Sequence, residues 1–132
     1  MSEVELILRG EASSKEMNAL FRDAYPEHED RDFNRTLSRC DAYVVARRGS
    51  ELVGFAKIIG DDDLHAFLLD PIVRTDLRRR GIGRQLVAIC EQEAAALGYT
   101  YLHVDFEPQN EAFYAAIGFR GSLAGIKGLA AS

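Results

Sequence analysis

The stretch from residue 67 to residue 98 constrains the fold more than any other part of the chain. Two apolar runs (67–69 and 72–73) predict a strand, Arg78-x-x-Gly81-x-Gly83 predicts a turn, and the spacing up to Leu97 predicts a long helix closed by Gly98. A helix start presents unpaired N–H groups and a partial positive charge. Glycines let a ligand approach the backbone, and arginines pair with phosphate oxygens. This unit therefore predicts a pyrophosphate site.

Two common phosphate-binding motifs are excluded. The chain contains no Gly-x-x-x-x-Gly-Lys-Ser/Thr run, which a P-loop requires. A dinucleotide-binding loop needs a third glycine after Gly81 and Gly83, but Leu86 occupies that position. The simplest alternative is a glycine turn whose arginines are merely solvated.

The rest of the chain alternates between strand and helix patterns. Ser13 and Glu16 have the spacing of a capping box, so we expect a helix from there to about Tyr25. Pro71 cannot donate a hydrogen bond to a sheet, which predicts a bulge or an interruption in its strand. The other expected elements are strands at Val4–Leu8, Ala42–Arg47, Leu52–Ile59, Leu64–Val73 and Tyr101–Phe106, helices at Phe33–Ser38 and from Pro108 to before Gly118, and a closing strand or hairpin from Phe119.

This order of elements predicts a single α/β domain over residues 1–132, with one mixed sheet and helices on its faces. An antiparallel meander followed by a βαβ crossover excludes a plain doubly wound sheet.

Charge and cysteine usage narrow the class of ligand and the compartment. The net charge is −5, yet five arginines fall within residues 74–84, opposed only by Asp76. An acidic body with one basic spot argues against a broad nucleic-acid surface and favours a compact polyanion as the ligand.

No apolar stretch is long enough to span a membrane, the first nine residues lack signal-peptide order, and Cys40 and Cys90 lack metal-type spacing. We therefore expect a cytoplasmic protein with reduced thiols and no bound metal.

Three segments together resemble the GNAT superfamily of N-acetyltransferases. Arg78-x-x-Gly81-x-Gly83 is similar to the acyl-CoA loop of that family. The strand Leu69–Val73 precedes it, as the family's cofactor-contacting strand does. Leu102-x-Val104 followed by Ala112-Phe113-Tyr114-x-x-x-Gly118-Phe119 is similar to the family's second motif. The resemblance implies the acyl-CoA N-acyltransferase fold, a mostly antiparallel sheet splayed between its fourth and fifth strands.

The resemblance also implies acetyl-CoA as co-substrate. Backbone groups of Ile72 and Val73 would contact the two amides of the pantetheine arm, because unpaired strand edges need partners. The pyrophosphate would lie on the turn, and any of the arginines could reach the 3′-phosphate of the ribose. The implied cofactor-binding residues are Ile72, Val73, Arg78, Arg79, Arg80, Gly81, Ile82, Gly83, Arg84, Asn110 and Tyr114.

The implied catalytic residues are Tyr114 and Asp70. A phenol, with a pKa near ~10, can protonate a departing thiolate at neutral pH. Asp70 is the leading candidate for the base that takes the amine proton, directly or through water. His65, Asp105 and Glu107 are alternatives for the base. A backbone N–H of Ile72 or Val73 would stabilise the oxyanion.

One position departs from the family pattern. The family asparagine seven residues before the tyrosine is replaced by Glu107, and the nearest asparagine is Asn110. Either Asn110 makes the cofactor contact from a shifted place, or Glu107 caps the helix and the contact is lost. The stretch after Gly118 is short, so we expect a reduced final strand pair or one completed by a second subunit in a homodimer.

The expected activity is therefore acetyl transfer to a primary amine of a small molecule or a protein, with the charged loop Pro26–Cys40 roofing the acceptor. Two alternatives stay open: a non-catalytic acyl-CoA sensor on the same fold, and a small nucleic-acid-binding domain that uses the arginine cluster.

Overall fold

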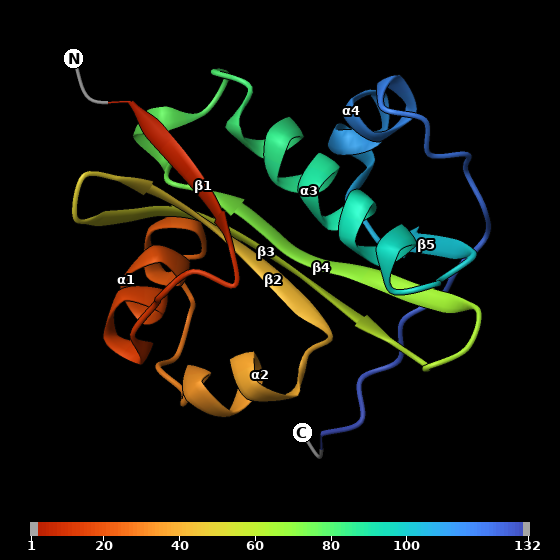
Figure 1. Ribbon diagram of the computed structural model, residues 1–132, viewed down its shortest axis with the longest axis horizontal. Coiled ribbons are helices and arrows are strands. Elements are labelled where there is room, and N and C mark those ends of the chain that lie inside the picture. Colours follow the sequence, from red (N-terminus) through yellow and green to blue (C-terminus); the bar gives the residue numbers. More distant parts are fainter. Residues whose placement is uncertain (1–2, 131–132) are drawn as a thin grey trace.

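The computed structural model describes residues 3–130, which form one sheet with helices on both faces (Figure 1). The strand order in the sheet is β1-β2-β3-β4-β5. The first four strands are antiparallel to their neighbours, and β5 is parallel to β4. This confirms the predicted mixed sheet. The strands are β1 (Val4–Leu8), β2 (Ala42–Arg48), β3 (Glu51–Gly60), β4 (His65–Val73) and β5 (Tyr101–Val104).

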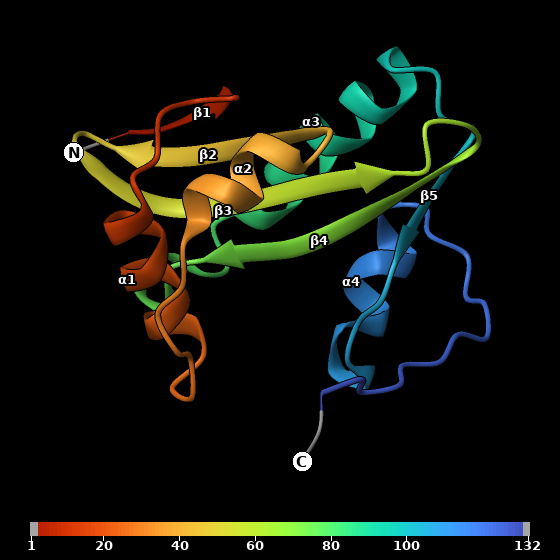
Figure 2. The same ribbon diagram turned by 90° about the horizontal axis from the view of Figure 1, so that it is seen from below.

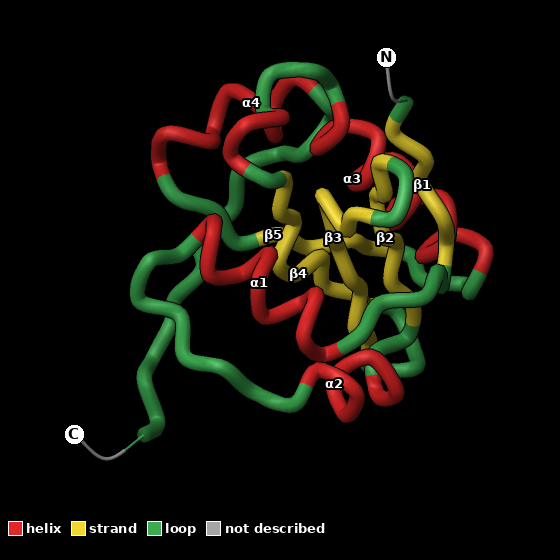
Figure 3. The backbone as a smooth tube through the Cα atoms, turned by 90° about the vertical axis from the view of Figure 1, so that its left-hand side faces the viewer, coloured by secondary structure: helices red, strands yellow, loops and turns green. Residues whose placement is uncertain are grey.

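The four α-helices lie in two layers, one on each face of the sheet, as Figures 1 and 3 show. Helices α1 and α2 cover one face, and α3 and α4 lie on the other. The helices are α1 (Ser14–Ala24), α2 (Phe33–Arg39), α3 (Ile82–Ala96) and α4 (Glu111–Ala116), and short 3₁₀ turns occur at Thr75–Leu77 and Pro108–Asn110.

The sheet separates two hydrophobic cores. Successive side chains of a strand point to opposite faces, so Val44 packs with Leu86 of α3 while Val45 packs with Met17 of α1. All four of these side chains are fully buried. Because both faces of the central strands are covered, β2 and β3 read as nearly continuous apolar runs.

A bulge distorts β4 at the predicted proline. Phe55 pairs with Ile72 and Lys57 pairs with Leu69, so Asp70 and Pro71 lie opposite the single residue between them on β3. Asp70 adopts a left-handed backbone with φ 53°. The predicted interruption at Pro71 is therefore confirmed.

The fourth and fifth strands separate beyond this bulge. Their parallel pairing runs from His65↔Tyr101 to Leu68↔Val104 and then stops, while β4 continues to Val73. Figure 2 shows β5 turning away from the end of β4. The edge of β4 over residues 69–73 that β5 leaves unpaired is called the β4–β5 gap below. The predicted splay is confirmed.

The expected closing strand after Phe119 is not formed in the part of the chain that the structure describes. The Phe119 N–H donates to the carbonyl of Tyr114, and residues 120–130 are exposed and belong to no helix or strand. Three glycines raise the entropic cost of ordering this segment. Its aliphatic residues (Leu123, Ile126 and Leu129) recur at every third position, which does not match the two-residue period of a half-buried strand.

Within residues 3–130, no helix has both the length and the apolar character that a bilayer crossing requires.

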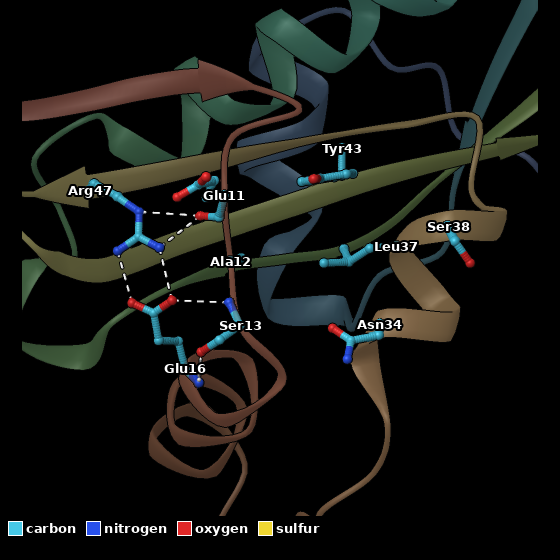
Figure 4. A pocket seen from close by; sticks show the side chains of 9 residues that line it. All are labelled: Glu11, Ala12, Ser13, Glu16, Asn34, Leu37, Ser38, Tyr43 and Arg47. Atoms are coloured by element: carbon cyan, nitrogen blue, oxygen red, sulfur yellow. Dashed lines mark hydrogen bonds and ion pairs between the residues drawn. The ribbon is translucent and has the colours of Figure 1, made fainter.

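An arginine clasp joins the start of α1 to the sheet (Figure 4). Ser13 and Glu16 form the predicted capping box, in which each side chain accepts from the other's backbone N–H. Arg47 of β2 donates to both carboxylate oxygens of Glu16, at 2.9 Å each, and to the carbonyl of Glu11 at 2.7 Å. The clasp therefore fixes both the first turn of α1 and the loop that leads into it.

Replacing Glu16 by Gln should lower thermal stability in a pH-dependent way. Hydrogen bonds from Arg47 are the largest cause that lowers the pKa of Glu16, from 4.5 to about 2. The stabilisation by the ionised carboxylate is therefore present above pH 4.5 and is lost as the pH falls toward about 2. Gln can still close the capping box through its amide oxygen, but its NH2 group cannot accept the second hydrogen bond from Arg47. The variant therefore removes the ion pair and keeps the box. Melting curves from pH 7 to pH 2 should show a difference that disappears at the acid end.

Glu27→Gln, in the exposed loop after α1, is the matched control and should melt like the wild type at every pH. An unchanged difference between Glu16→Gln and wild type at pH 2 and pH 7 would contradict the clasp.

Candidate functional site

The glycine turn delivers an open helix start beside the end of β4. Gly81 is the N-cap of α3 with φ 84°, and Arg79 is also left-handed, with φ 67°. No side chain caps the helix, and its first turn closes with Gln85 N–H donating to the Gly81 carbonyl at 3.1 Å. A Cβ on Gly81 would have nothing within 4 Å. The first N–H groups of α3 are therefore left without a side-chain cap, as an anion site requires.

The five arginines of this region divide into two groups. Arg74 is engaged in ion pairs with Glu51 and Asp76, at 2.8 and 2.7 Å, and Arg78 Nε donates to the Val73 carbonyl at 3.2 Å. The other three are exposed and form no hydrogen bond or ion pair within residues 3–130: Arg79, Arg80 and Arg84. These three are the free cations at the open helix start.

The turn is also tied to the opposite face of the sheet. The Asp23 carboxylate, in the last turn of α1, accepts from the Thr75 N–H at 2.8 Å and from the Thr75 hydroxyl at 3.1 Å. Asp23 thus caps the 3₁₀ turn that leads from β4 to the glycine turn.

Tyr114 lies in a set of phenyl rings on the α3 side of the sheet. Its ring stacks on Phe106 with centroids 4.8 Å apart and meets the edges of Phe113 and Phe119 at 4.9 and 5.6 Å. Within residues 3–130, every buried side-chain nitrogen or oxygen has a hydrogen-bond partner. The Tyr114 hydroxyl makes no hydrogen bond, so it is not one of these buried atoms. It therefore has some solvent contact, although the residue as a whole is only 6% exposed. Burial, and then the charge of Tyr25, raise its pKa, which keeps the phenol protonated.

Asp70 lies on the α1 side of the gap and is ion-paired. Lys57 Nζ of β3 lies 3.0 Å from Asp70 Oδ2. Tyr25, the C-cap residue of α1, lies within electrostatic range: burial, and then the charge of Asp70, raise its pKa, while Arg78 opposes this. Tyr25 also acts on the pKa of Tyr114. The gap is thus flanked by a phenol on one face and by a carboxylate with a second phenol on the other.

The remaining predicted residues are distributed unevenly around the gap. Ile72 is buried in the core beneath α1, whereas Val73 is half-buried toward α3. Asp105 and Glu107 are exposed just after the last paired residue of β5. His65 lies at the other end of β4, five residues or roughly 15 Å from Asp70, where its Nδ1 is 2.7 Å from His103 Nε2. This position is too remote for His65 to act as the base.

Glu107 stands at the N-cap of the 3₁₀ turn before α4, and its carbonyl accepts from the Asn110 N–H at 2.9 Å. Its side chain makes no capping hydrogen bond to the 3₁₀ turn that follows. Asn110 is exposed, precedes α4 and also makes no side-chain capping bond. Its amide is free to bind a ligand.

Sequence reasoning missed Lys57 altogether and named Tyr25 only as an apolar residue of a loop. A single charged residue within the apolar run 52–59 is the signal that could have found Lys57. No sequence signal places Tyr25 beside Asp70, because they are 45 positions apart in the chain.

A separate hollow of about 580 Å³ lies on the α1/α2 side, beside the Arg47 clasp (Figure 4). Arg47 is fully engaged there by Glu16 and by backbone carbonyls, so the hollow offers no free cation. It does not coincide with the gap. Within the described residues, no cluster of three or more His, Cys, Asp or Glu side chains could hold a metal ion.

Comparisons with known proteins agree on one class of protein, the acetyltransferases. Residues 12–119 match the model of the acetyltransferase (GNAT) family. They make up more than half of the chain, and the protein therefore belongs to the GNAT family. A curated relative, an uncharacterized N-acetyltransferase of Pyropia yezoensis, is 28% identical over 80 residues, 61% of this chain. The chain spans about half of that relative, 46% of its length.

Solved structures agree in fold. A GNAT-family acetyltransferase of Streptococcus pneumoniae superimposes with a TM-score of 0.80 at 18% identity, covering 98% of this chain and 100% of that one. The aminoglycoside N-acetyltransferase AAC(6′)-Iy in complex with CoA gives 0.78 at 19%, covering 98% and 96%. Glucosamine-6-phosphate N-acetyltransferase from Arabidopsis thaliana gives 0.78 at 11%, covering 97% and 99%. At such identities the likeness concerns the fold alone.

Two glycines of the turn should respond to alanine with opposite signs. Gly81→Ala forces a Cβ into a left-handed residue and should cost about 1 kcal/mol, although no atom blocks it. Gly83 lies inside α3, and its Cβ would meet Val73 Cγ2 at an ordinary 3.7 Å. Gly83→Ala should therefore stabilise by up to about 1 kcal/mol. Urea unfolding of the two variants measures both effects, and equal signs would contradict the backbone described here.

Proposed function

We propose that this protein transfers the acetyl group of acetyl-CoA to a primary amine, which attacks the thioester directly in a ternary complex. The observation that carries the proposal is the β4–β5 gap, with the free Tyr114 hydroxyl on one face and Asp70 on the other. The open glycine turn follows at the end of β4.

The residues present fit acetyl-CoA. The N–H groups of residues 79–84 and the free side chains of Arg79, Arg80 and Arg84 would hold its phosphates. The unpaired edge of β4 at Ile72 and Val73 would pair with the pantetheine amides, although the Val73 carbonyl already accepts from Arg78 and this bond would have to yield or be shared. Asn110, with its free amide beside Tyr114, is a further candidate contact. The complex of AAC(6′)-Iy with CoA supports this choice of co-substrate.

The chemistry needs three proton transfers and one stabilised oxyanion. Asp70, directly or through a water, would take a proton from the acceptor ammonium, and the neutral amine would attack the thioester carbonyl. A backbone N–H of Ile72 or Val73 would stabilise the oxygen as it gains charge. When the C–S bond breaks, Tyr114 would give its proton to the departing thiolate. The second proton that the nitrogen loses as the amide forms would restore the phenol, directly or through a water. Burial favours this role, because it raises the pKa of Tyr114 and keeps the proton available.

The acceptor would enter from the face that carries Asp70 and Tyr25, beneath the loop between α1 and α2. Aminoglycoside and glucosamine-6-phosphate acetyltransferases are among the structures similar in fold. Amino-sugar amines are therefore reasonable first compounds for a screen, alongside polyamines and peptide lysines.

Removing two of the free arginines should weaken coenzyme A binding. Replacing Arg79 and Arg80 together by Gln removes charge-assisted contacts to phosphate, each worth about 1.5–3 kcal/mol. We expect at least about a tenfold increase in Kd by calorimetry, and a smaller effect at high salt. Arg35→Gln, on the exposed side of α2, is the matched control and should bind like the wild type. Absence of binding heat for the wild type would overturn the proposed co-substrate.

Tyr114→Phe should slow turnover without weakening coenzyme A binding. Loss of a general acid costs about a hundredfold or more in kcat, whereas the hydroxyl makes no bond that the fold needs. Thiol release from acetyl-CoA with an amine panel measures kcat, and calorimetry measures Kd. Tyr101→Phe, at the opposite end of β5, is the control. A wild type that binds coenzyme A but releases no thiol would favour a non-catalytic acyl-CoA sensor. Salt-dependent oligonucleotide binding that acetyl-CoA does not displace would favour a nucleic-acid-binding domain.

A further inference from the structure

Lys57 lies in the middle of an apolar strand and is largely buried. Its side chain is 12% exposed, and the neighbouring residues of β3 from 52 to 59 carry no other charge. Lysine is rarely buried without a counter-charge. Here the counter-charge is Asp70, with Nζ 3.0 Å from Oδ2.

The ion pair spans the bulge in β4. Lys57 pairs with Leu69 in the sheet, immediately before the bulge, and its side chain reaches the left-handed Asp70. A left-handed conformation is tolerated by Asp better than by most residues, but it costs free energy. The ion pair with the Lys57 ammonium of the adjacent strand holds the Asp70 carboxylate in the position that this backbone conformation gives it.

The ion pair with Lys57 does not enclose the Asp70 carboxylate. Within residues 3–130 the other oxygen, Oδ1, accepts no hydrogen bond, and the Asp70 side chain remains 31% exposed. The carboxylate is therefore held by Lys57 and is still accessible to a ligand.

We propose that Lys57 is a positioning residue for acetyl transfer: by holding Oδ2 of Asp70, it orients Oδ1 to take the proton of the acceptor amine. The inference rests on the proposed function. In the step, the acceptor ammonium gives one proton to Asp70 and becomes the attacking amine, and Asp70 then releases that proton to solvent. Lys57 itself exchanges no proton.

The test compares Lys57→Met, which keeps the length of the side chain but removes its charge, with Lys57→Arg, which keeps the charge. Misplacing the base should lower kcat for the best amine of the screen by about tenfold to a hundredfold in Lys57→Met, with the Kd for coenzyme A unchanged. Lys57→Arg should recover most of that rate. Lys15→Met, on the exposed first turn of α1, is the matched control and should retain full activity. Thermal unfolding verifies that each variant is folded.

A double-mutant cycle with Asp70→Asn decides between positioning and general stabilisation. If Lys57 acts through Asp70, Lys57→Met/Asp70→Asn should be no slower than Asp70→Asn alone. The inference would be overturned by additive losses in the double variant, by an unchanged kcat in Lys57→Met, or by a parallel loss of coenzyme A affinity. In each of these cases an active wild type would preserve the proposed function. A wild type that acetylates no amine would overturn both.

Discussion

The end of hydrogen bonding between β4 and β5 is the constraint on which the rest of the site depends. Pairing stops after Leu68 and Val104, and the bulge at Asp70–Pro71 follows directly. A bulge adds twist and bends its strand, so the last part of β4 diverges from its parallel neighbour. The backbone groups left there need a partner in the functional state. The glycine turn, Tyr114 and Asp70 all lie around this opening.

Much of the fold could be predicted from local patterns. The capping box at Ser13, the meander over residues 42–73 and the long helix after Gly81 follow from periodicity and from turn residues. The prediction was wrong after Phe119, where Gly-rich sequence with aliphatic residues at every third position forms no strand within the described residues. Strand β5 ends at Val104 rather than Phe106, because Phe106 turns to stack on Tyr114. A tertiary contact of this kind has no signature in local sequence.

The candidate site, like the fold, could be predicted from the sequence only in part. The glycine turn and Tyr114 belong to contiguous motifs, so their positions could be predicted, whereas their roles stay proposals. The partners of charged groups could not be predicted: Arg74 is bound by Glu51 from β3, and Asp70 is bound by Lys57. Both pairs join residues that only the strand register brings together. The strand register also places His65 at the paired end of β4, away from Asp70.

The bond between Asp23 and Thr75 has a mechanical consequence. It fastens the last turn of α1 to the segment that carries the phosphate-facing backbone, and Tyr25 lies two positions further along. The position of the end of α1 on one side of the sheet is therefore coupled to that of the turn on the other side through a single carboxylate, in addition to the packing in the core.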